Sequence, residues 1–110
     1  MNPEAERWAH LLAENLATAE KLASVSLNDY LESVELQLAF EALVMRVGDL
    51  AKRLVQLQDS LRDKEPWSSA ARARDFAAHH YHRVDSVAIY KTVRESFPLL
   101  AEALRELNRP

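Results

Sequence analysis

The residues of this sequence that could do chemistry lie close together, in the run Arg-Asp-Phe-Ala-Ala-His-His-Tyr at positions 74–81. Arg74 carries a permanent planar cation that can hold a phosphate, and His79 carries the side chain whose ordinary pKa lies nearest neutrality. Together they could bind a phosphodiester and move protons around it. The run therefore indicates nuclease chemistry that needs no metal ion.

The spacing of Arg74 and His79 restricts how they could meet. Residues five apart on a regular helix differ in direction by about 140°, so the two side chains do not share a face. They converge only if the helix loosens near His79, or if two copies of the chain contribute to one cleft. Asp75, in contrast, can meet His79 on an intact turn, where its carboxylate would orient the ring and favour the protonated form. Both geometries stay open.

The composition predicts one helical domain. A chain of 110 residues with 48% hydrophobic and 28% charged residues is long enough to bury one sizeable core. The single Gly, the four Pro and the lack of β-branched runs favour long helices over sheet. The absence of Cys excludes disulfides, thiolate catalysis and Cys-ligated zinc.

The charge is unevenly distributed. The net charge of −3 argues against electrostatic binding of nucleic acid over a broad surface, yet residues 71–83 carry a net charge of +2. A local basic site thus lies on an acidic body. No stretch approaches the ~20 apolar residues that span a bilayer, and the acidic start is unlike a signal peptide. We therefore expect a soluble, cytoplasmic protein.

Capping residues and apolar spacing predict the helices around the motif. Asn2 and Pro3 suit the start of a first helix that ends at about residue 23. A connector over 24–33 has room for one turn around 27–31. Lys64-Glu65-Pro66 is expected to end the long helix that follows, and Trp67-Ser68-Ser69 to open the helix that carries Arg74 and His79, with a Ser as its cap. Asp85 can cap a last helix, which Pro98 should kink or restart.

The long central helix is expected to run from Ser33 to about Asp63, a length of roughly 45 Å. The only glycine, Gly48, lies in its middle, and we weigh a close helix approach, as at a dimer interface, against a tolerated defect. A helix this long should pack against its own neighbours and against a second copy. Its apolar residues alternate steps of four and three, as in a heptad seam: Leu36, Phe40, Leu43, Val47, Leu50, Leu54, Leu57 and Leu61.

The run Arg74, polar residue, three further residues, His79, any residue, Tyr81 resembles the motif of HEPN-domain proteins. It is most similar to HepT-like toxins that pair with MntA-type minimal nucleotidyltransferase antitoxins. Three other stretches match in the same order: 47–54 is like the family's Gly-acidic-x-Ala-Lys-Arg-Leu run, 66–67 like its Pro-Trp, and 97–100 like its Leu-Pro-x-Leu ending. The resemblance covers about residues 5 to 107.

This resemblance implies one all-α HEPN (HepT-like) domain over residues 1–110, a four- to five-helix bundle that forms a homodimer. The implied activity is that of a toxin, a metal-independent endoribonuclease in which Arg74 holds the scissile phosphate and His79 transfers protons. Asp75 would support His79. Tyr81 would accept AMP from the nucleotidyltransferase antitoxin, which would block RNA by charge and bulk. No cofactor is implied beyond this AMP, which derives from ATP, and the antitoxin could join the dimer in a larger hetero-oligomer.

Other interpretations stay open beside this one. The residue between His79 and Tyr81 is commonly acidic in the family, whereas here it is His80, which could itself replace His79 in proton transfer. Asp75, His79 and His82 could ligate a metal, but no second ligand cluster such as Glu-x-x-His accompanies them, so no metal is predicted. The alternative functions are a non-catalytic helical dimer that binds RNA or a nucleotidyltransferase, and an acidic coiled-coil adaptor.

Overall fold

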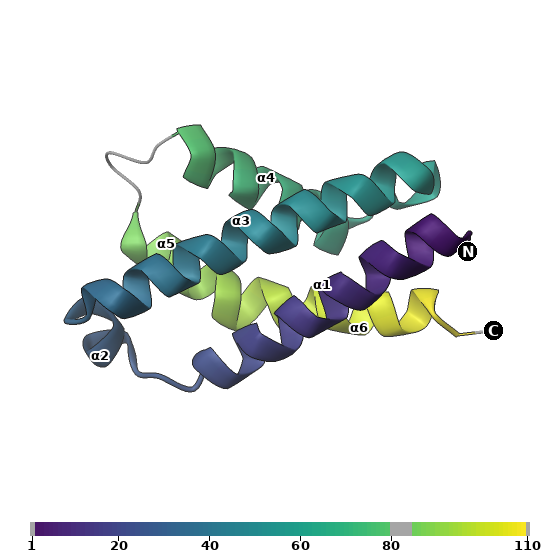
Figure 1. Ribbon diagram of the computed structural model, residues 1–110. Helices are drawn as coiled ribbons and strands as arrows, with labels where there is room; N and C mark the ends of the chain where they lie inside the picture. Colours follow the sequence, from purple (N-terminus) through teal and green to yellow (C-terminus); the bar gives the residue numbers. More distant parts are fainter. Residues whose placement is uncertain (1, 80–84, 110) are drawn as a thin grey trace.

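The computed structural model describes residues 2–79 and 85–109, and in these ranges it contains helices and no strand, which confirms the all-α prediction. Helix α3 runs across the molecule, with α4 along one side and α1 along the other (Figure 1). The α-helices are α1 (Pro3–Leu22), α2 (Leu27–Leu31), α3 (Val34–Leu57), α4 (Glu65–His79), α5 (Ser86–Lys91) and α6 (Phe97–Leu107).

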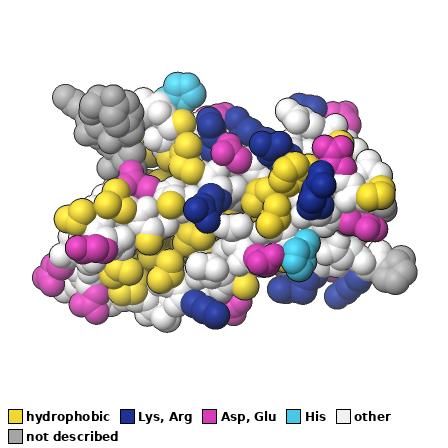
Figure 2. Space-filling view, viewed as in Figure 1, with side chains coloured by type: hydrophobic (Ala, Val, Ile, Leu, Met, Phe, Trp, Pro, Cys, Tyr) yellow, Lys and Arg dark blue, Asp and Glu magenta, His cyan; other side chains and the backbone are white. Residues whose placement is uncertain are grey.

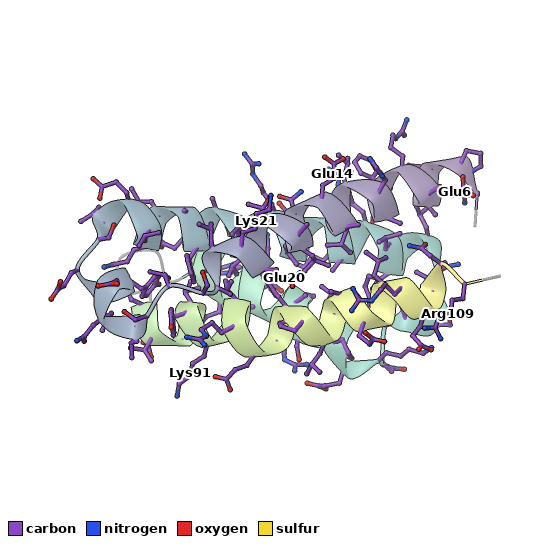
Figure 3. All side chains as sticks on the ribbon, turned by 90° about the horizontal axis from the view of Figure 1, so that it is seen from below. Glu6, Glu14, Glu20, Lys21, Lys91 and Arg109 are labelled. Carbon is purple, nitrogen blue, oxygen red and sulfur yellow. The ribbon has the colours of Figure 1, made fainter. Side chains whose placement is uncertain are left out.

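Helix α1 begins and ends close to where the sequence predicts. The Asn2 side chain accepts a hydrogen bond from the Ala5 amide at 2.7 Å, and Pro3 occupies the first turn. The short α2 forms at the predicted turn, with Ser26 as its cap. Helices α1 and α6 lie side by side, and charged side chains of α1 such as Glu14 point away from α6 (Figure 3). Helix α1 packs mainly on α3 and α6, whereas α6 also contacts α4.

The long helix is shorter than predicted. Helix α3 ends at Leu57, because Gln58 leaves helical geometry at φ −138° and ψ 87°, and a 3₁₀ turn follows over Asp59–Leu61. The expectation of one helix to about residue 63 is therefore wrong, although Leu61 is still buried at the end of the seam. The tighter 3₁₀ turn places Leu61 in the core while the chain reverses toward α4.

The expected start of the next helix is also wrong by two residues. Helix α4 begins at Glu65, not at Trp67, and the predicted Ser cap lies inside the helix. Pro66 thus stands in the first turn, where its missing N–H has no helical partner to lose. The same proline was expected to end the preceding helix, but that helix has already ended at Leu57.

The seam of α3 packs against helices of the same chain. Phe40, Leu43, Val47, Leu54 and Leu61 are buried, and the remaining seam residues are half-buried. This part of the packing prediction is confirmed, whereas packing against a second copy stays a prediction. Within the ranges that the structure describes, no helix is both long enough and apolar enough to cross a membrane.

Three aromatic side chains close the end of the bundle where α2, α3 and α5 meet. The ring of Tyr30 lies 4.7 Å from that of Phe40 and 5.0 Å from that of Tyr90, measured between centroids. The Tyr30 hydroxyl donates to the Ser86 carbonyl at 2.8 Å, and the Tyr90 hydroxyl to the Val25 carbonyl at 2.7 Å. Both tyrosines are packing residues with satisfied hydroxyl groups. We call Tyr30, Phe40 and Tyr90 the aromatic cluster.

The C-terminal helices follow the predicted signals. The Asp85 carboxylate accepts hydrogen bonds from the amides of Val87 and Ala88, so it caps α5. A π-helical turn over Thr92–Ser96 separates α5 from α6, and Pro98 stands in the first turn of α6. Since Pro98 has no N–H, the regular helical ladder cannot continue through it, and the wider turn absorbs the interruption. The predicted kink or restart is confirmed.

Candidate active site

The motif residues Arg74 and His79 lie on the same helix, α4, which stays helical through His79. The loosened turn that would bring them together within one chain is therefore not formed at His79. On a regular helix the two side chains leave the axis in directions about 140° apart. The geometry of one chain thus presents the guanidinium and the imidazole on different sides of α4.

Arg74 is held by acidic groups on both helices of the α3–α4 contact. Its Nε donates to Oδ1 of Asp49 on α3 at 2.7 Å, and its Nη1 lies 3.6 Å from Oδ1 of Asp75. The side chain is 28% exposed, so it is packed but reachable. A guanidinium has five N–H donors, and these contacts leave donors for a phosphate. Asp49 thus fixes the position of the guanidinium group of Arg74 through its Nε atom.

Asp75 is engaged by cations through its side chain. Lys52 on α3 forms an ion pair with the Asp75 carboxylate. The hydrogen bond from Lys52 holds the pKa of the Asp75 carboxyl below its ordinary value, and the charges of Lys52 and Arg74 act in the same direction. Asp75 is therefore ionised at neutral pH and contributes a fixed negative charge between two cations.

His79 contacts Asp75 across an intact helical turn, which is one of the two predicted geometries. The contact is made to the backbone of Asp75 and not to its side chain. Nδ1 of His79 lies 2.7 Å from the backbone carbonyl oxygen of Asp75, not from the carboxylate. The expected carboxylate–imidazole contact is thus corrected, because Lys52 and Arg74 already occupy the carboxylate. A carbonyl oxygen only accepts, so Nδ1 carries a proton and Nε2 of the neutral ring is the basic nitrogen. His79 is exposed, which leaves Nε2 open to a substrate.

Gly48 explains how α3 and α4 approach so closely at Arg74. A Cβ atom at position 48 would lie 2.2 Å from Cβ of Arg74 and 2.9 Å from the carbonyl oxygen of Ala70. No larger residue fits without moving one of the helices. The predicted close approach is confirmed, but it joins two helices of one chain, and so Gly48 is not merely a tolerated defect.

Sequence reasoning missed the positioning roles of Asp49 and Lys52. Both face α4 from α3. The acidic Asp49 pairs with Arg74, and the basic Lys52 pairs with Asp75. A signal was available, because an acidic residue directly after the only glycine and a basic residue three positions later lie on one helical face. Which residues of α4 they would meet could not be read from that spacing.

Two predicted residues cannot be placed in this arrangement. His80, the alternative proton-transfer residue, and Tyr81, the predicted AMP acceptor, lie outside the described residues, as does His82. Their roles stay predictions. Among residues 2–79 and 85–109, no group of three or more His, Asp and Glu side chains is arranged to hold a metal ion.

A helical bundle that holds an arginine between acidic side chains and exposes a histidine on the same helix fits a class of proteins that act on phosphodiesters. Comparison with known families agrees with this class, since the family model described as ribonuclease HepT-like matches residues 12–107. The chain belongs to the HepT-like ribonuclease family, as the resemblance in the sequence implied.

Two relatives carry names that agree with this family. The chain is 26% identical over 98 residues to "Putative RNase TTE0752" of Caldanaerobacter subterraneus subsp. tengcongensis, covering 89% of this chain and 88% of the relative. It is 27% identical over 99 residues to "Probable ribonuclease HepT" of Thermococcus cleftensis, covering 89% and 90% of the two chains. No solved structure matches the chain significantly.

Proposed function

We propose that this protein is a metal-independent endoribonuclease that acts as the toxin of a toxin–antitoxin pair in the cytoplasm. The observation that carries the proposal is the arrangement around α4, where Arg74 is held by Asp49 and His79 exposes a basic Nε2. Membership of the HepT-like family and the names of both relatives support RNA as the substrate.

In the proposed reaction, Arg74 binds the non-bridging oxygens of the scissile phosphate and stabilises the charge that develops on them. His79 accepts the proton of the ribose 2′-hydroxyl at Nε2. The 2′-oxygen then forms a bond to phosphorus, the bond to the leaving 5′-oxygen breaks, and the protonated His79 gives its proton to that oxygen. DNA would not be cleaved by this route, because it lacks the 2′-hydroxyl. The chain's own residues carry every step, without a cofactor.

A homodimer would resolve the divergence of Arg74 and His79 on α4. Two copies whose α4 helices face each other would line one cleft with two arginines and two histidines, so that groups from both chains could reach one phosphate. The half-exposed setting of Arg74 is compatible with such a cleft. The proposed active site is therefore incomplete in a single chain and needs residues of both copies.

The proposed switch is the transfer of AMP to Tyr81 by a minimal nucleotidyltransferase antitoxin, with ATP as the AMP donor. Tyr81 follows the end of α4 by two residues. A phosphate attached there would place negative charge and bulk close in sequence to the cation of Arg74 and the ring of His79, which would exclude RNA by repulsion and obstruction. The antitoxin would then bind the toxin dimer in a larger hetero-oligomer.

The test of catalysis compares RNA cleavage by purified wild type, Arg74→Ala and His79→Ala, with Arg105→Ala as a matched control. Arg105 also pairs with a carboxylate, that of Glu102 at 2.7 Å, but on α6. We expect the two motif variants to lose roughly 10²- to 10⁴-fold in rate and the control to keep the wild-type rate. All rates are measured in the presence of a chelator, because a metal-independent reaction should be unaffected by it. Motif variants that stay folded and cleave like wild type would overturn the proposal.

One observation favours a second candidate, a non-catalytic helical dimer that binds RNA or the nucleotidyltransferase. Arg74 contacts two carboxylates, an arrangement that a purely structural ion-pair network would also produce. In that case wild type without AMP would bind RNA and leave it intact. Intact mass after expression with and without the antitoxin shows whether the tested sample carries AMP.

A further inference from the structure

A basic groove lies between α3 and α4, beside Asp75. It encloses about 340 Å³, and the buried ring of Trp67 forms part of its floor. Its polar lining, by which we define the basic groove, consists of Lys52, Gln56, Arg62, Ser68, Arg72 and Asp75. The chemistry proposed above uses none of these side chains except Asp75.

Three cations from three different segments converge on this groove. Lys52 comes from α3, Arg62 follows the 3₁₀ turn, and Arg72 comes from α4. The lining itself thus carries three cations against the one carboxylate of Asp75, in a chain of net charge −3. Figure 2 shows Lys and Arg side chains gathered over the region of α3 and α4, whereas acidic side chains prevail at the end near α2. A polyanion would be drawn to this part of the surface.

The two arginines of the groove remain available to a ligand. Arg62 pairs with Asp59 and Arg72 with Glu65, each at 2.8 Å, and their side chains are 61% and 65% exposed. Exposed ion pairs of this kind contribute little to stability, so a phosphate can add to them or replace the carboxylate at little cost. Both guanidinium groups also keep N–H donors beyond these pairs.

The groove is continuous with the candidate active site. Lys52 and Asp75 line it, and Oδ1 of Asp75, which pairs with Lys52, also lies 3.6 Å from Nη1 of Arg74. Ser68, Arg72 and Asp75 are spaced four and three apart, so they follow one face of α4 over about 10 Å. A chain of phosphates bound at Arg74 would therefore have the groove cations Lys52, Arg72 and Arg62 as further contacts.

The lining favours contacts to a phosphate backbone over contacts to bases. Trp67 is only 1% exposed, so its ring cannot serve as a stacking platform. Positive charge and hydroxyl or amide donors position a strand through its phosphates without reading its sequence. We infer that the basic groove binds the RNA backbone beside the scissile phosphate, an inference that rests on the proposed ribonuclease function.

The test uses a 2′-O-methyl oligoribonucleotide, which lacks the internal nucleophile and therefore measures binding without cleavage. The Arg62→Ala/Arg72→Ala double variant is compared with wild type and with Arg105→Ala/Arg109→Ala. The control pair also consists of exposed arginines, each paired with a glutamate three residues earlier. We expect the groove variant to bind about tenfold more weakly, and the control to bind like wild type.

The salt dependence of binding gives a second readout that a purely structural effect would not change. Each lost phosphate contact to a single strand should reduce the slope of log K against log salt by about 0.7. In cleavage assays the loss should fall mainly on KM rather than on kcat. Equal dissociation constants for RNA and equal slopes for the groove and control variants would overturn the inference. A loss of affinity for another protein would not rescue it.

These measurements separate the groove from the proposed function itself. If wild type does not cleave RNA but the groove variant still binds the oligonucleotide more weakly with a reduced slope, the groove inference holds and the catalytic proposal fails. If Arg74→Ala abolishes cleavage while the groove variant binds and cleaves like wild type, the catalytic proposal holds and the groove inference fails.

Discussion

The aromatic cluster and the contact between α3 and α4 both depend on α3, yet they differ in almost every physical property. Tyr30 and Phe40 are fully buried, whereas Arg74 is 28% and Asp49 50% exposed. The aromatic cluster is held by ring packing and two hydroxyl bonds to carbonyl groups, and the α3–α4 contact at Gly48 by ion pairs around a missing side chain. The aromatic cluster thus contributes mainly to stability, whereas Asp49 and Lys52 on α3 hold the charged groups of α4 in place.

The magnitudes explain why these tasks are separated. A fully buried large apolar side chain contributes about 1.5–3 kcal/mol, whereas an exposed ion pair contributes about 0–1 kcal/mol. Because little folding free energy depends on Asp49, Lys52 and Arg74, these side chains can be arranged for a ligand. Substitutions in the two regions should therefore differ in the free energy of unfolding that they cost, from Phe40 with the largest effect to Asp49 with the smallest.

Phe40→Ala should lower the free energy of unfolding by about 3–5 kcal/mol, because it removes a fully buried ring and leaves a cavity between Tyr30 and Tyr90. Urea denaturation measures the change, and Phe40→Leu serves as a milder variant that should stay folded. RNA cleavage per folded molecule should be unchanged in Phe40→Leu. A loss below 1 kcal/mol in Phe40→Ala would contradict the importance assigned to the aromatic cluster.

Gly48→Ala sets two effects against each other. Helix propensity gains about 1 kcal/mol, but the new Cβ overlaps Cβ of Arg74 and the Ala70 carbonyl, and such overpacking costs about 1–3 kcal/mol. We expect a net destabilisation together with a displaced Arg74 and reduced cleavage. Ala17→Gly on the exposed face of α1 calibrates the propensity term alone. A Gly48→Ala protein that is more stable than wild type would show that the helices separate freely.

Tyr30→Phe should cost about 1 kcal/mol at neutral pH, because the Ser86 carbonyl loses its hydrogen bond. Burial raises the pKa of Tyr30 to about 12, and the charge of Glu41 acts in the same direction. In the unfolded chain the phenol ionises near pH 10, whereas in the folded chain it keeps its proton up to about pH 12. This contribution to stability is therefore complete below pH 10 and is lost as the pH rises toward 12.

The alkaline part of this prediction is measured by denaturation at several pH values between 9 and 12. Wild type should lose stability more steeply than Tyr30→Phe in that window, since the variant has no phenol to ionise there. Parallel pH profiles of the two proteins would show that another group causes the alkaline loss.

Asp49→Asn should have the smallest effect on stability, less than about 1 kcal/mol, because the pair with Arg74 is half-exposed. Its effect on cleavage should be larger, roughly 10- to 100-fold in kcat, since a displaced guanidinium no longer matches the phosphate. Glu102→Gln removes the partner of Arg105 in the same way and is the matched control. Full activity at saturating RNA in Asp49→Asn would mean that Asp49 does not position Arg74.

The elements that sequence reasoning predicted well are those with local causes. The Asn2 and Asp85 caps, the seam of α3 and the interruption at Pro98 depend on residues within one or two turns of each other. The junction between α3 and α4 was predicted poorly, because a 3₁₀ turn that buries Leu61 has no distinct local pattern. Pro66 is compatible with both the end and the start of a helix, and only the packed chain selects the start.

By itself, the sequence determined the helical class, the position of the motif on the helix that follows the long one, and the family to which the chain belongs. Only the tertiary structure decided which groups surround Arg74 and which atom of Asp75 His79 meets. The physical reason is that helix formation depends on spacing within a segment. The partners of a charge depend on how closely two distant segments approach, and here that approach is set by the absence of a side chain at Gly48.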